Sequence, residues 1–599
     1  METSSQEPGV SHKNLNVVDQ ESQQQSSDAK KKGGWSTFPF LAVAMFGLGI
    51  ARGGATSNLV VYLVEKYNVP RVDAAQISSI ALGCLSLAPV GGAVVADAFF
   101  GCYPVVAVSM VFSVLVYIIA TLFLSPLPVE THQHLLPHMQ SLVVFTLTAS
   151  FHGLRPTPCE LNTGPCDPAS TGQMAVLYIG IFLLCVSAGG ARFNQATLGA
   201  SQFDTQADRD VLFNWYFVFF NASSVVGYTA IVYVQDTVSW ALGYGVSGAA
   251  SLVGLMALLL GTRYYRRPPP QGSPFTALAR VAVAAARKWK VNMGTLEGSA
   301  SFYHGRPRDS DMDDDASDDT KRGPSNSFSS LNRAALITDG DVTASDGSVV
   351  RPWRICTVQQ VEDFKTLLRV MPLWSTSIVL SVAFGTQINF TVLQALAMNR
   401  ALGRFTVPAS SMIVIILVSI VISIGLFDRV VQPLTRRLTS GRSPTPLQRI
   451  GAGHVLAIVS VAMSAIVERQ RMDTVHAHGE EGNARWVSPL SAMWLVLPLV
   501  LAGAGEALYF PGGVMLYYEE FPAALKNTST GMVAVIIALG FYLSTALVDV
   551  VRRTTAWLPN NMNASRLDNL YWLLAVLLAV NFVYYLVCAR LYRYQNVGK

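Results

Sequence analysis

The sequence predicts an all-α membrane protein in which twelve transmembrane helices form two bundles of six. Three observations support this fold class: the chain is 51% hydrophobic, only 14% of its residues are charged, and its mean hydropathy is +0.37. A soluble domain usually carries about 25% charged residues, so the deficit indicates a lipid environment. The net charge of +5 is small and segregated along the chain, which argues against a nucleic-acid partner.

Twelve apolar runs each come close to the ~20 residues that a helix needs to cross the hydrocarbon layer of a bilayer. They lie near residues 38–64, 75–99, 103–125, 174–198, 212–234, 239–261, 370–396, 407–431, 449–468, 489–513, 529–551 and 569–592. The hydrophilic stretch 262–369 divides them six and six. Two parallel six-span repeats around a site near mid-membrane are typical of the major facilitator architecture.

This division predicts five segments. They are a disordered tail over 1–33, a six-helix bundle over 34–261, a linker over 262–369, a second bundle over 370–594 and a short tail over 595–599. The first segment is polar, ends in three lysines and has no apolar core with a cleavage site, so it does not resemble a secretory signal peptide. Basic loops fall on the side of this tail, which places both termini in the cytosol by the positive-inside rule.

The linker contains two different kinds of sequence. Residues 274–290 alternate apolar and basic side chains as in an amphipathic helix, which we expect to lie on the inner membrane surface. Residues 309–319 form an acidic low-complexity run that we expect to be disordered. Ser310 and Ser317 in that run are candidate phosphate acceptors for a kinase, and residues 357–370 are expected to form a helix that leads into the seventh span.

One arginine and one glutamate stand out because each interrupts a long apolar run. Arg192 follows the apolar stretch that begins near Met174, and Glu506 is the only acid in its own run. A charge at membrane depth costs several kcal/mol, so it usually faces a water-filled cavity or an opposite charge. We therefore expect Arg192 and Glu506 to face each other across a substrate path. The alternative is an ion pair that only holds two helices together.

Other polar residues carry weaker signals. Asp97 and Asp428 end corresponding spans of the two halves, where they either brace an inner gate or cap helices. Asn563 begins a glycosylation sequon in a predicted outer loop. Cys159 and Cys166 share one polar loop and are either a disulfide or two free thiols. The seven cysteines include no C-x-x-C pair, and we expect no metal site, no cofactor other than coupling protons, and no enzymatic activity.

Several stretches, taken together and in order, resemble the plant nitrate/peptide transporter family within the proton-dependent oligopeptide transporter superfamily. The match runs from about Phe38 to the C-terminus. It rests on NLVVYL, GGAVVADAFFG, GGARFN with SQFD, NWYFVFFNASSVVG, WRICTVQQVEDFKTLLRVMPLW, GAGEALYFPG and TSTGM. The resemblance implies that Arg192 and Glu506 are the facing span-four and span-ten charges, with Glu506 involved in binding, gating and proton coupling. It also implies that Asn221 approaches the substrate and that Asp97 belongs to the loop signature between spans two and three.

The chain departs from this family in two spans, the first and the seventh, at residues that matter for function. The span-one motif E-x-x-E-R, which is tied to proton coupling, should fall at Met45, Leu48 and Gly49, and both acids are absent. Arg52 lies one helical turn further on, where it either enters the cavity or reaches toward the membrane surface. A span-seven histidine of a nitrate-transporting relative corresponds to Gly385. Gln387 remains nearby as either a substrate contact or an interhelical hydrogen-bonding residue.

The sequence thus predicts a secondary transporter that moves a small anionic or zwitterionic solute by alternating access, with proton coupling as symport. Nitrate, a di- or tripeptide and a carboxylate hormone all suit a cavity that contains Arg52, Arg192 and Glu506. The alternatives are an uncoupled facilitator or exporter, and a non-transporting membrane sensor that acts through the linker. The expected location is the plasma membrane or the vacuolar membrane of a plant cell.

Overall fold

The computed structural model describes most of the chain. The described residues are 32–122, 156, 168–267, 274–290, 302–304, 323–325, 327–338, 341, 351–438, 444–520 and 528–592. Among them, eleven helices are long and apolar enough to cross a membrane, and a twelfth contributes the shorter apolar stretch Cys102–Val114. The predicted all-helical membrane fold is therefore confirmed.

The first half consists of the helices that precede the linker. Their bounds are α2 Phe38–Thr56, α3 Leu59–Lys66, α4 Arg71–Val95, α5 Cys102–Leu122, α7 Thr171–Ala200, α8 Gln206–Val226, α9 Val232–Thr237 and α10 Trp240–Leu260. Helix α7 begins with a capping box in which Ser170 and Gln173 exchange side-chain and backbone hydrogen bonds, which satisfies amide groups that a helix start leaves free. Small residues let these helices approach closely: a Cβ atom at Gly53 of α2 would lie 3.1 Å from Cα of Gly227.

The second half follows the same principles. Its helices are α12 Val358–Leu396, α13 Val414–Leu426, α14 Gln432–Leu438, α15 Pro446–His478, α16 Val496–Glu520, α17 Thr528–Thr554 and α18 Leu567–Leu591. Capping boxes start α12 at Thr357 and α15 at Thr445. Short strands lie between the helices: β1 (Met398–Asn399) pairs in parallel with β4 (Ser488–Ser491), and β2 (Ala401–Leu402) forms a hairpin with β3 (Phe405–Thr406).

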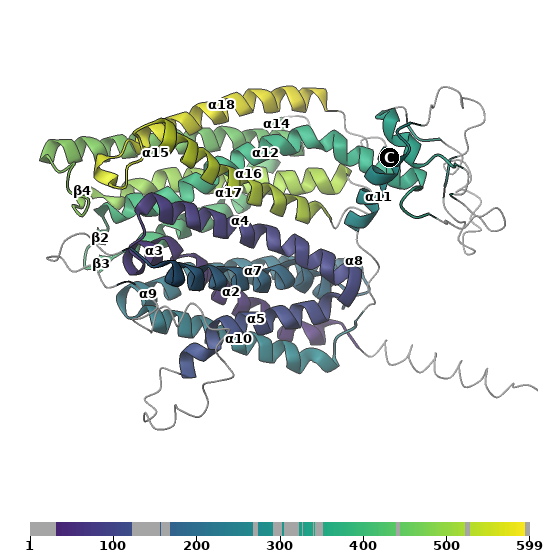
Figure 1. Cartoon of the computed structure of the whole chain (residues 1–599), viewed down its shortest axis with the longest axis horizontal. Coiled ribbons are helices and arrows are strands. Elements are labelled where there is room, and N and C mark those ends of the chain that lie inside the picture. The colour runs from purple at the N-terminus through teal and green to yellow at the C-terminus, as the bar shows by residue number, and fades with distance from the viewer. Residues whose placement is uncertain are drawn as a thin grey trace, which may run out of the picture.

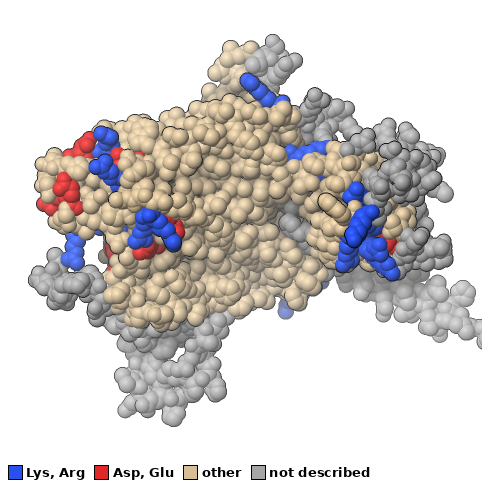
Figure 2. Space-filling view, turned by 45° about the horizontal axis from the view of Figure 1, so that its top comes forward, with Lys and Arg blue, Asp and Glu red and all other residues tan. Residues whose placement is uncertain are grey.

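Figure 1 shows the two halves as two adjacent layers of roughly parallel helices, with the second half above the first. They meet along α4 and α17. The linker helix α11 (Pro274–Arg287) lies at one end of the molecule, which we call the linker end, and the strands lie at the opposite end, the far end. In Figure 2 most of the visible charged side chains gather at these two ends, and an uncharged band separates them. Such a band is the surface that a bilayer requires.

The apolar face of the linker helix α11 packs on the protein rather than on the membrane. Val281 and Ala284 lie in a buried cluster with Ala334 of the short helix η10 (Ser329–Ala334) and with Val358 and Val361 at the start of α12. This corrects the expectation that α11 rests on the membrane surface, because the chain itself covers the apolar face. The acidic run 309–319, with Ser310 and Ser317, lies outside the described residues.

Three short π-helical segments widen the helices locally. They are η2 (Ala96–Phe100), η5 (Gly227–Ile231) and η12 (Phe427–Val431). The backbones of Asp97 and Asp428 occupy the second position of η2 and of η12, so the two halves repeat this feature at corresponding places. Their side chains lie outside the described part of the chain, and an inner-gate role for the two acids stays a prediction.

Candidate functional site

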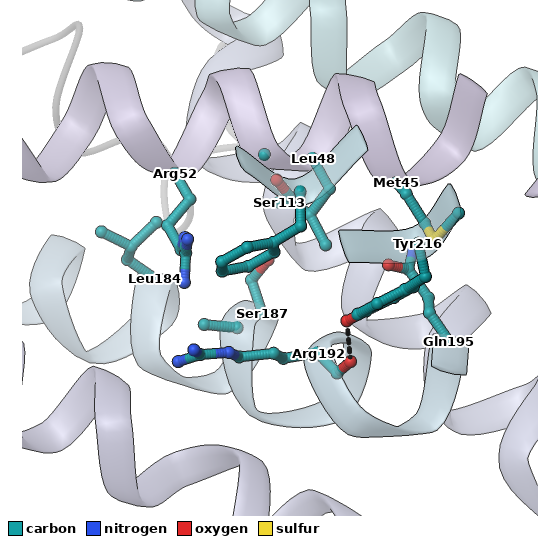
Figure 3. Close-up of a pocket in the computed structure, with 12 residues that line it drawn as sticks. Met45, Leu48, Arg52, Ser113, Leu184, Ser187, Arg192, Gln195 and Tyr216 are labelled. Carbon is teal, nitrogen blue, oxygen red and sulfur yellow. Dashed lines mark hydrogen bonds between the residues drawn. The ribbon is translucent and has the colours of Figure 1, made fainter. Parts of the chain in front are cut away.

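A cavity of about 30 Å³ lies inside the first half, between α2, α5, α7 and α8 (Figure 3). Each of these helices presents one face to the cavity, because the lining residues of α2 and α7 recur at three- to four-residue intervals. The lining residues are Met45, Leu48, Gly49, Arg52, Ser113, Leu184, Ser187, Ala188, Arg192, Gln195, Tyr216 and Phe220. Positions one helical turn apart share a face, so the four residues from Met45 to Arg52 enter the cavity together. These include the three positions at which the family's span-one motif should stand.

Arg192 points into the cavity because the glycines just before it occupy other faces of α7. A Cβ atom at Gly190 would lie 1.6 Å from Oγ of Ser109 on α5, and one at Gly92 of α4 would lie 2.1 Å from the carbonyl oxygen of Gly189. These contacts hold α7 against α4 and α5. Since an α-helix turns by about 100° per residue, Arg192 emerges on a different face, toward α2 and α8. Figure 3 shows its side chain extended along the cavity.

Arg52 reaches the same cavity from α2. The neighbouring small residues of α2 face other helices: Gly53 contacts Gly227, and a Cβ atom at Gly54 would lie 2.2 Å from Oγ of Ser247 on α10. The close packing of α2 therefore fixes the direction in which the arginine leaves the helix. Of the two possibilities that the sequence left open for Arg52, the structure places the side chain in the cavity.

A single aromatic ring lies beside both guanidinium groups. The Cζ atom of Arg52 lies 4.7 Å from the centre of the Phe220 ring, and that of Arg192 lies 5.1 Å from it. Tyr216, one turn earlier on α8, stacks on Phe220 with 6.4 Å between ring centres. Its hydroxyl donates a 2.7 Å hydrogen bond to the carbonyl oxygen of Arg192. The aromatic pair thus positions both cations, by cation–π attraction and by this hydrogen bond.

The cavity carries two positive charges and no acidic lining residue. Within the described residues, neither guanidinium forms an ion pair or donates a hydrogen bond. Both arginines are half-buried, and a guanidinium presents five donors in a planar fork. Two such forks in one small cavity, without partners among the described residues, offer N–H donors that suit the acceptor oxygens of an anion.

Glu506 does not take part in this arrangement. It lies on α16 in the second half, is absent from the lining of the cavity, and forms no ion pair with Arg192. One of its carboxylate oxygens, Oε2, is buried without a hydrogen-bond donor in the described structure. Arg192 and Glu506 therefore form no ion pair in this conformation, and the expectation that they face each other across a substrate path stays a prediction. Arg192 is oriented by contacts within its own half.

Two further candidate residues lie outside the cavity. Gln387 is buried in α12, and its Nε2 donates hydrogen bonds of 2.9 Å to the hydroxyls of both Ser460 and Ser464 on α15. Its amide is thus engaged in joining two helices, which was the second of the two predicted roles, and the substrate-contact role stays a prediction. Asn221 follows Phe220 on α8 and is not among the residues that line the cavity.

The structure also contradicts the predicted glycosylation of Asn563. Its side chain is fully buried, and its Nδ2 donates hydrogen bonds of 2.9 Å to the carbonyl oxygens of Asn483 and Trp486. A glycan on this nitrogen would displace both bonds and find no space in the folded protein. Cys159 and Cys166 lie outside the described residues.

A buried charge network in the second half was not anticipated from the sequence. Glu468 and Arg471 of α15 are fully buried and form a two-pronged ion pair with N–O distances of 2.7 and 3.0 Å. Arg471 also donates to Oδ1 of Asn563 at 2.8 Å, and Gln394 of α12 donates to Glu468 at 2.8 Å. The i, i+3 spacing of Glu468 and Arg471 was a usable signal, since it places both on one helix face.

The two halves are joined by side-chain contacts at the far end. Asn389 of α12 donates a 2.8 Å hydrogen bond to Ser79 of α4, and Arg552 of α17 pairs with Asp73 of α4. Ser410, which follows the β2–β3 hairpin, donates a 2.7 Å hydrogen bond to Asn58 at the break between α2 and α3. The far end is therefore closed between the halves.

Two bundles of membrane-spanning helices, the first of which contains a charged cavity, define a polytopic membrane transporter of the major facilitator fold. The family model described as PTR2, POT family, matches residues 141–564, so the chain belongs to the POT family. Among curated relatives from Arabidopsis thaliana, Protein NRT1/ PTR FAMILY 2.3 is 42% identical over 580 residues, with 97% of this chain and 96% of the relative covered. Protein NRT1/ PTR FAMILY 2.7 is 41% identical over 573 residues, with 96% and 95% covered. The predicted family membership is confirmed.

A solved structure supports the fold independently. The crystal structure of an auto-inhibited POT family peptide transporter aligns with a TM-score of 0.65 and 17% sequence identity, covering 94% of this chain and 98% of that chain. At this identity the similarity concerns the arrangement of helices alone.

Proposed function

We propose that this transporter carries a small monovalent anion, of which nitrate is the best match, and that the anion binds between Arg52 and Arg192. The observation that supports this proposal is the pair of guanidinium groups without acidic partners in one cavity. A guanidinium offers parallel N–H donors that suit a planar oxyanion. The anion supplies acceptors that the described residues of the protein do not provide.

The size of the cavity favours a small ion over a peptide or a hormone. Its volume of about 30 Å³ is roughly two to three times what is needed to hold one water molecule. An ion of four heavy atoms needs little widening of this space, whereas a dipeptide needs the halves to separate. The family as a whole includes transporters of nitrate and of peptides, so a peptide or another carboxylate-bearing solute is the alternative substrate class.

We further propose that transport follows alternating access. The contacts at the far end then form one of the two gates of the transporter, in its closed state. Both termini and the linker would then face the cytosol, in the plasma membrane or the vacuolar membrane, and the cavity would load or empty on the cytosolic side. Glu506 is proposed as a proton-responsive group, because its carboxylate lies in the second half with an unpartnered oxygen and can approach the cavity only when the halves move.

A counterflow assay in proteoliposomes tests the substrate class. Wild-type protein should exchange labelled nitrate, and unlabelled nitrate should compete more strongly than a dipeptide or a plant carboxylate hormone. Arg192→Gln should weaken nitrate binding by roughly 10- to 100-fold, since a hydrogen bond to a charged group contributes about 1.5–3 kcal/mol. Arg267→Gln is the matched control, because Arg267 also lies over an aromatic ring, that of Tyr103, but is exposed at the surface. Equal loss in both variants would contradict the proposed site.

Proton coupling is tested through Glu506→Gln. Nitrate uptake by the wild type is expected to rise when the outside pH falls from 7.5 to 5.5 and to fall when a protonophore is added. The variant should lose this pH dependence while it still exchanges nitrate at equilibrium. If uptake by the wild type ignores both treatments, the protein is a facilitator or an exporter, and Glu506 has no coupling role.

The sensor alternative depends on the linker. The packing of α11 against η10 and the start of α12 gives the linker a defined attachment to the seventh span, through which a signal could pass. Deleting residues 305–322 distinguishes the two functions: nitrate exchange should persist in a transporter, whereas a sensor would keep ligand affinity and lose its output.

A further inference from the structure

Like the Arg552–Asp73 pair, the far-end contact around Asn58 includes a carboxylate with solvent access, but here a buried asparagine connects that carboxylate to the second half. Asn58 is fully buried at the break between α2 and α3. Its Oδ1 accepts the 2.7 Å hydrogen bond from Ser410 of the second half, and its Nδ2 donates a 2.7 Å hydrogen bond to Oδ1 of Asp236 of α9. Asn58 thus connects an acid of one half to a hydroxyl of the other.

The charges around Asp236 come from three separate elements. Glu65, on α3, lies within electrostatic range of Asp236, with Lys66 beside it. Arg400, which precedes the β2–β3 hairpin of the second half, lies within range of both acids. The Arg400 side chain also donates a 3.3 Å hydrogen bond to the carbonyl oxygen of Val407, which ties it to the hairpin. Two acids of the first half therefore attract one cation of the second half across the closed gate.

The position of these acids suits proton exchange with the solution at the far end. The side chains of Glu65 and Asp236 are both exposed at the rim. The pKa of Glu65 is raised above its ordinary value by partial dehydration first and by the charge of Asp236 second. Two neighbouring carboxylates cannot both stay charged as readily as one. Acidification therefore removes negative charge from this pair at a milder pH than it would from an isolated glutamate.

We infer that Asp236, Glu65, Arg400 and the Asn58–Ser410 bridge form an acid-released latch that holds the far end closed. Protonation of the acid pair removes the attraction to Arg400, and the hydrogen bonds through Asn58 then hold the gate alone. The gate opens more readily toward an acidic compartment, which is the direction that proton-driven uptake requires. This inference extends the proposed transport cycle by placing a proton-responsive group at the gate of a chain that lacks the family's span-one acids.

The latch can be tested by a distance measurement that does not depend on substrate. Spin labels at Thr237 of α9 and Leu402 of β2, both exposed at the far end, report the separation of the halves in full-length protein in nanodiscs, after replacement of accessible native cysteines. In the otherwise wild-type background, lowering the pH from 7.5 to 5.5 should shift the population toward longer distances. Asp236→Asn keeps an acceptor for Asn58 but lacks the charge, so it should show the longer distances already at pH 7.5 and a smaller response to acid.

Two further variants separate the effect of the acid pair that faces Arg400 from the effect of the hydrogen bonds through Asn58. Ser410→Ala should lengthen the distances but keep the acid response, because the acids still face Arg400. Asp549→Asn is the matched control, since Asp549 also pairs with an arginine, Arg553, but within α17 of one half; it should behave like the wild type. If Asp236→Asn retains the wild-type distances and the wild-type response, the latch does not exist. If the distances respond as expected while nitrate exchange is absent, the latch stands and the proposed substrate is wrong.

Discussion

The two halves of this transporter treat interior arginines in opposite ways: Arg471 is fully buried, whereas Arg52 and Arg192 are half-buried. In the second half, Arg471 has a bidentate partner in Glu468 and further acceptors in Asn563 and the Met562 carbonyl, all at 2.7–3.0 Å. In the first half, Arg52 and Arg192 have only the face of Phe220 within the described structure. An arginine with all its donors satisfied holds helices together, whereas an arginine with free donors in a cavity is available to a ligand.

The cause of this difference is the geometry of the helices that carry the charges. Glu468 lies one turn before Arg471 on the same helix, so their pairing needs no relative movement of the halves. The acid expected to pair with Arg192 lies in the other half, and its approach depends on the conformation of the whole transporter. The static ion pair is thus local, whereas the charges that we propose to be functional lie in different halves.

Breaking the local pair should have the largest effect on stability. Glu468→Ala leaves Arg471 buried with an uncompensated charge, which typically costs about 3–5 kcal/mol. We expect a large drop in thermal unfolding temperature in detergent. Asp549→Ala, at an exposed pair, should change stability by less than about 1 kcal/mol. Similar losses in both variants would mean that the buried network does not stabilise the second half.

A second buried pair, in the linker, sharpens the comparison because it lies outside the membrane. Lys288 and Asp341 are both fully buried, with 2.8 Å between Nζ and Oδ2. Burial alone would raise the pKa of Asp341, but hydrogen bonds from Lys288 and Thr338 and the charges of Lys288 and Arg354 outweigh it and hold the pKa below its ordinary value of 3.8. The lowered pKa of Asp341 means that its ionised form stabilises the folded protein. This stabilisation is fully present above pH 3.8 and is lost as the pH falls through the lower pKa that Asp341 has in the folded state.

Asp341→Asn should therefore loosen the packing of α11 and η10 at neutral pH, by roughly 1–3 kcal/mol or more, because Lys288 loses its charged partner. Protease sensitivity and hydrogen exchange of residues 281–290 measure this loosening. In the wild type the same loosening should appear only below about pH 4, the ordinary range of an aspartate. If this variant exchanges nitrate at the wild-type rate, the result supports the transporter over the sensor. If residues 281–290 keep their protection from proteolysis and hydrogen exchange, the Lys288–Asp341 pair is dispensable.

The smallest effect is expected from the ring between the two arginines. Phe220→Leu keeps apolar volume and removes cation–π attraction, which is worth about 0.5–2 kcal/mol. Nitrate affinity should fall by a few-fold to about 30-fold with little change in stability. Phe219→Leu, at the adjacent α8 position outside the lining, is the control. An effect of Phe219→Leu as large as that of Phe220→Leu would indicate a general disturbance of α8.

The spans and their order could be read from hydrophobic run lengths alone, because each helix must satisfy its own backbone in lipid. A charge in an apolar run then located Arg192, and the helical spacing from Met45 to Arg52 indicated that Arg52 shares a face with the missing acids. Tyr216 and Phe220 could have been added from their i, i+4 spacing on an aromatic-rich helix. Each of these inferences concerns residues within one helix.

What the sequence by itself determined was therefore the set of membrane helices, their division into halves and the charges that they carry. Only the tertiary structure decided which charges meet. It paired Glu468 with Arg471, engaged Gln387 and Asn563 in hydrogen bonds, gathered Arg52 and Arg192 around Phe220, and left Glu506 apart from both arginines. The reason is physical: a helix fixes the direction of a side chain relative to its own axis, but the partner of that side chain depends on how glycine contacts and interhelical hydrogen bonds set the helices against one another.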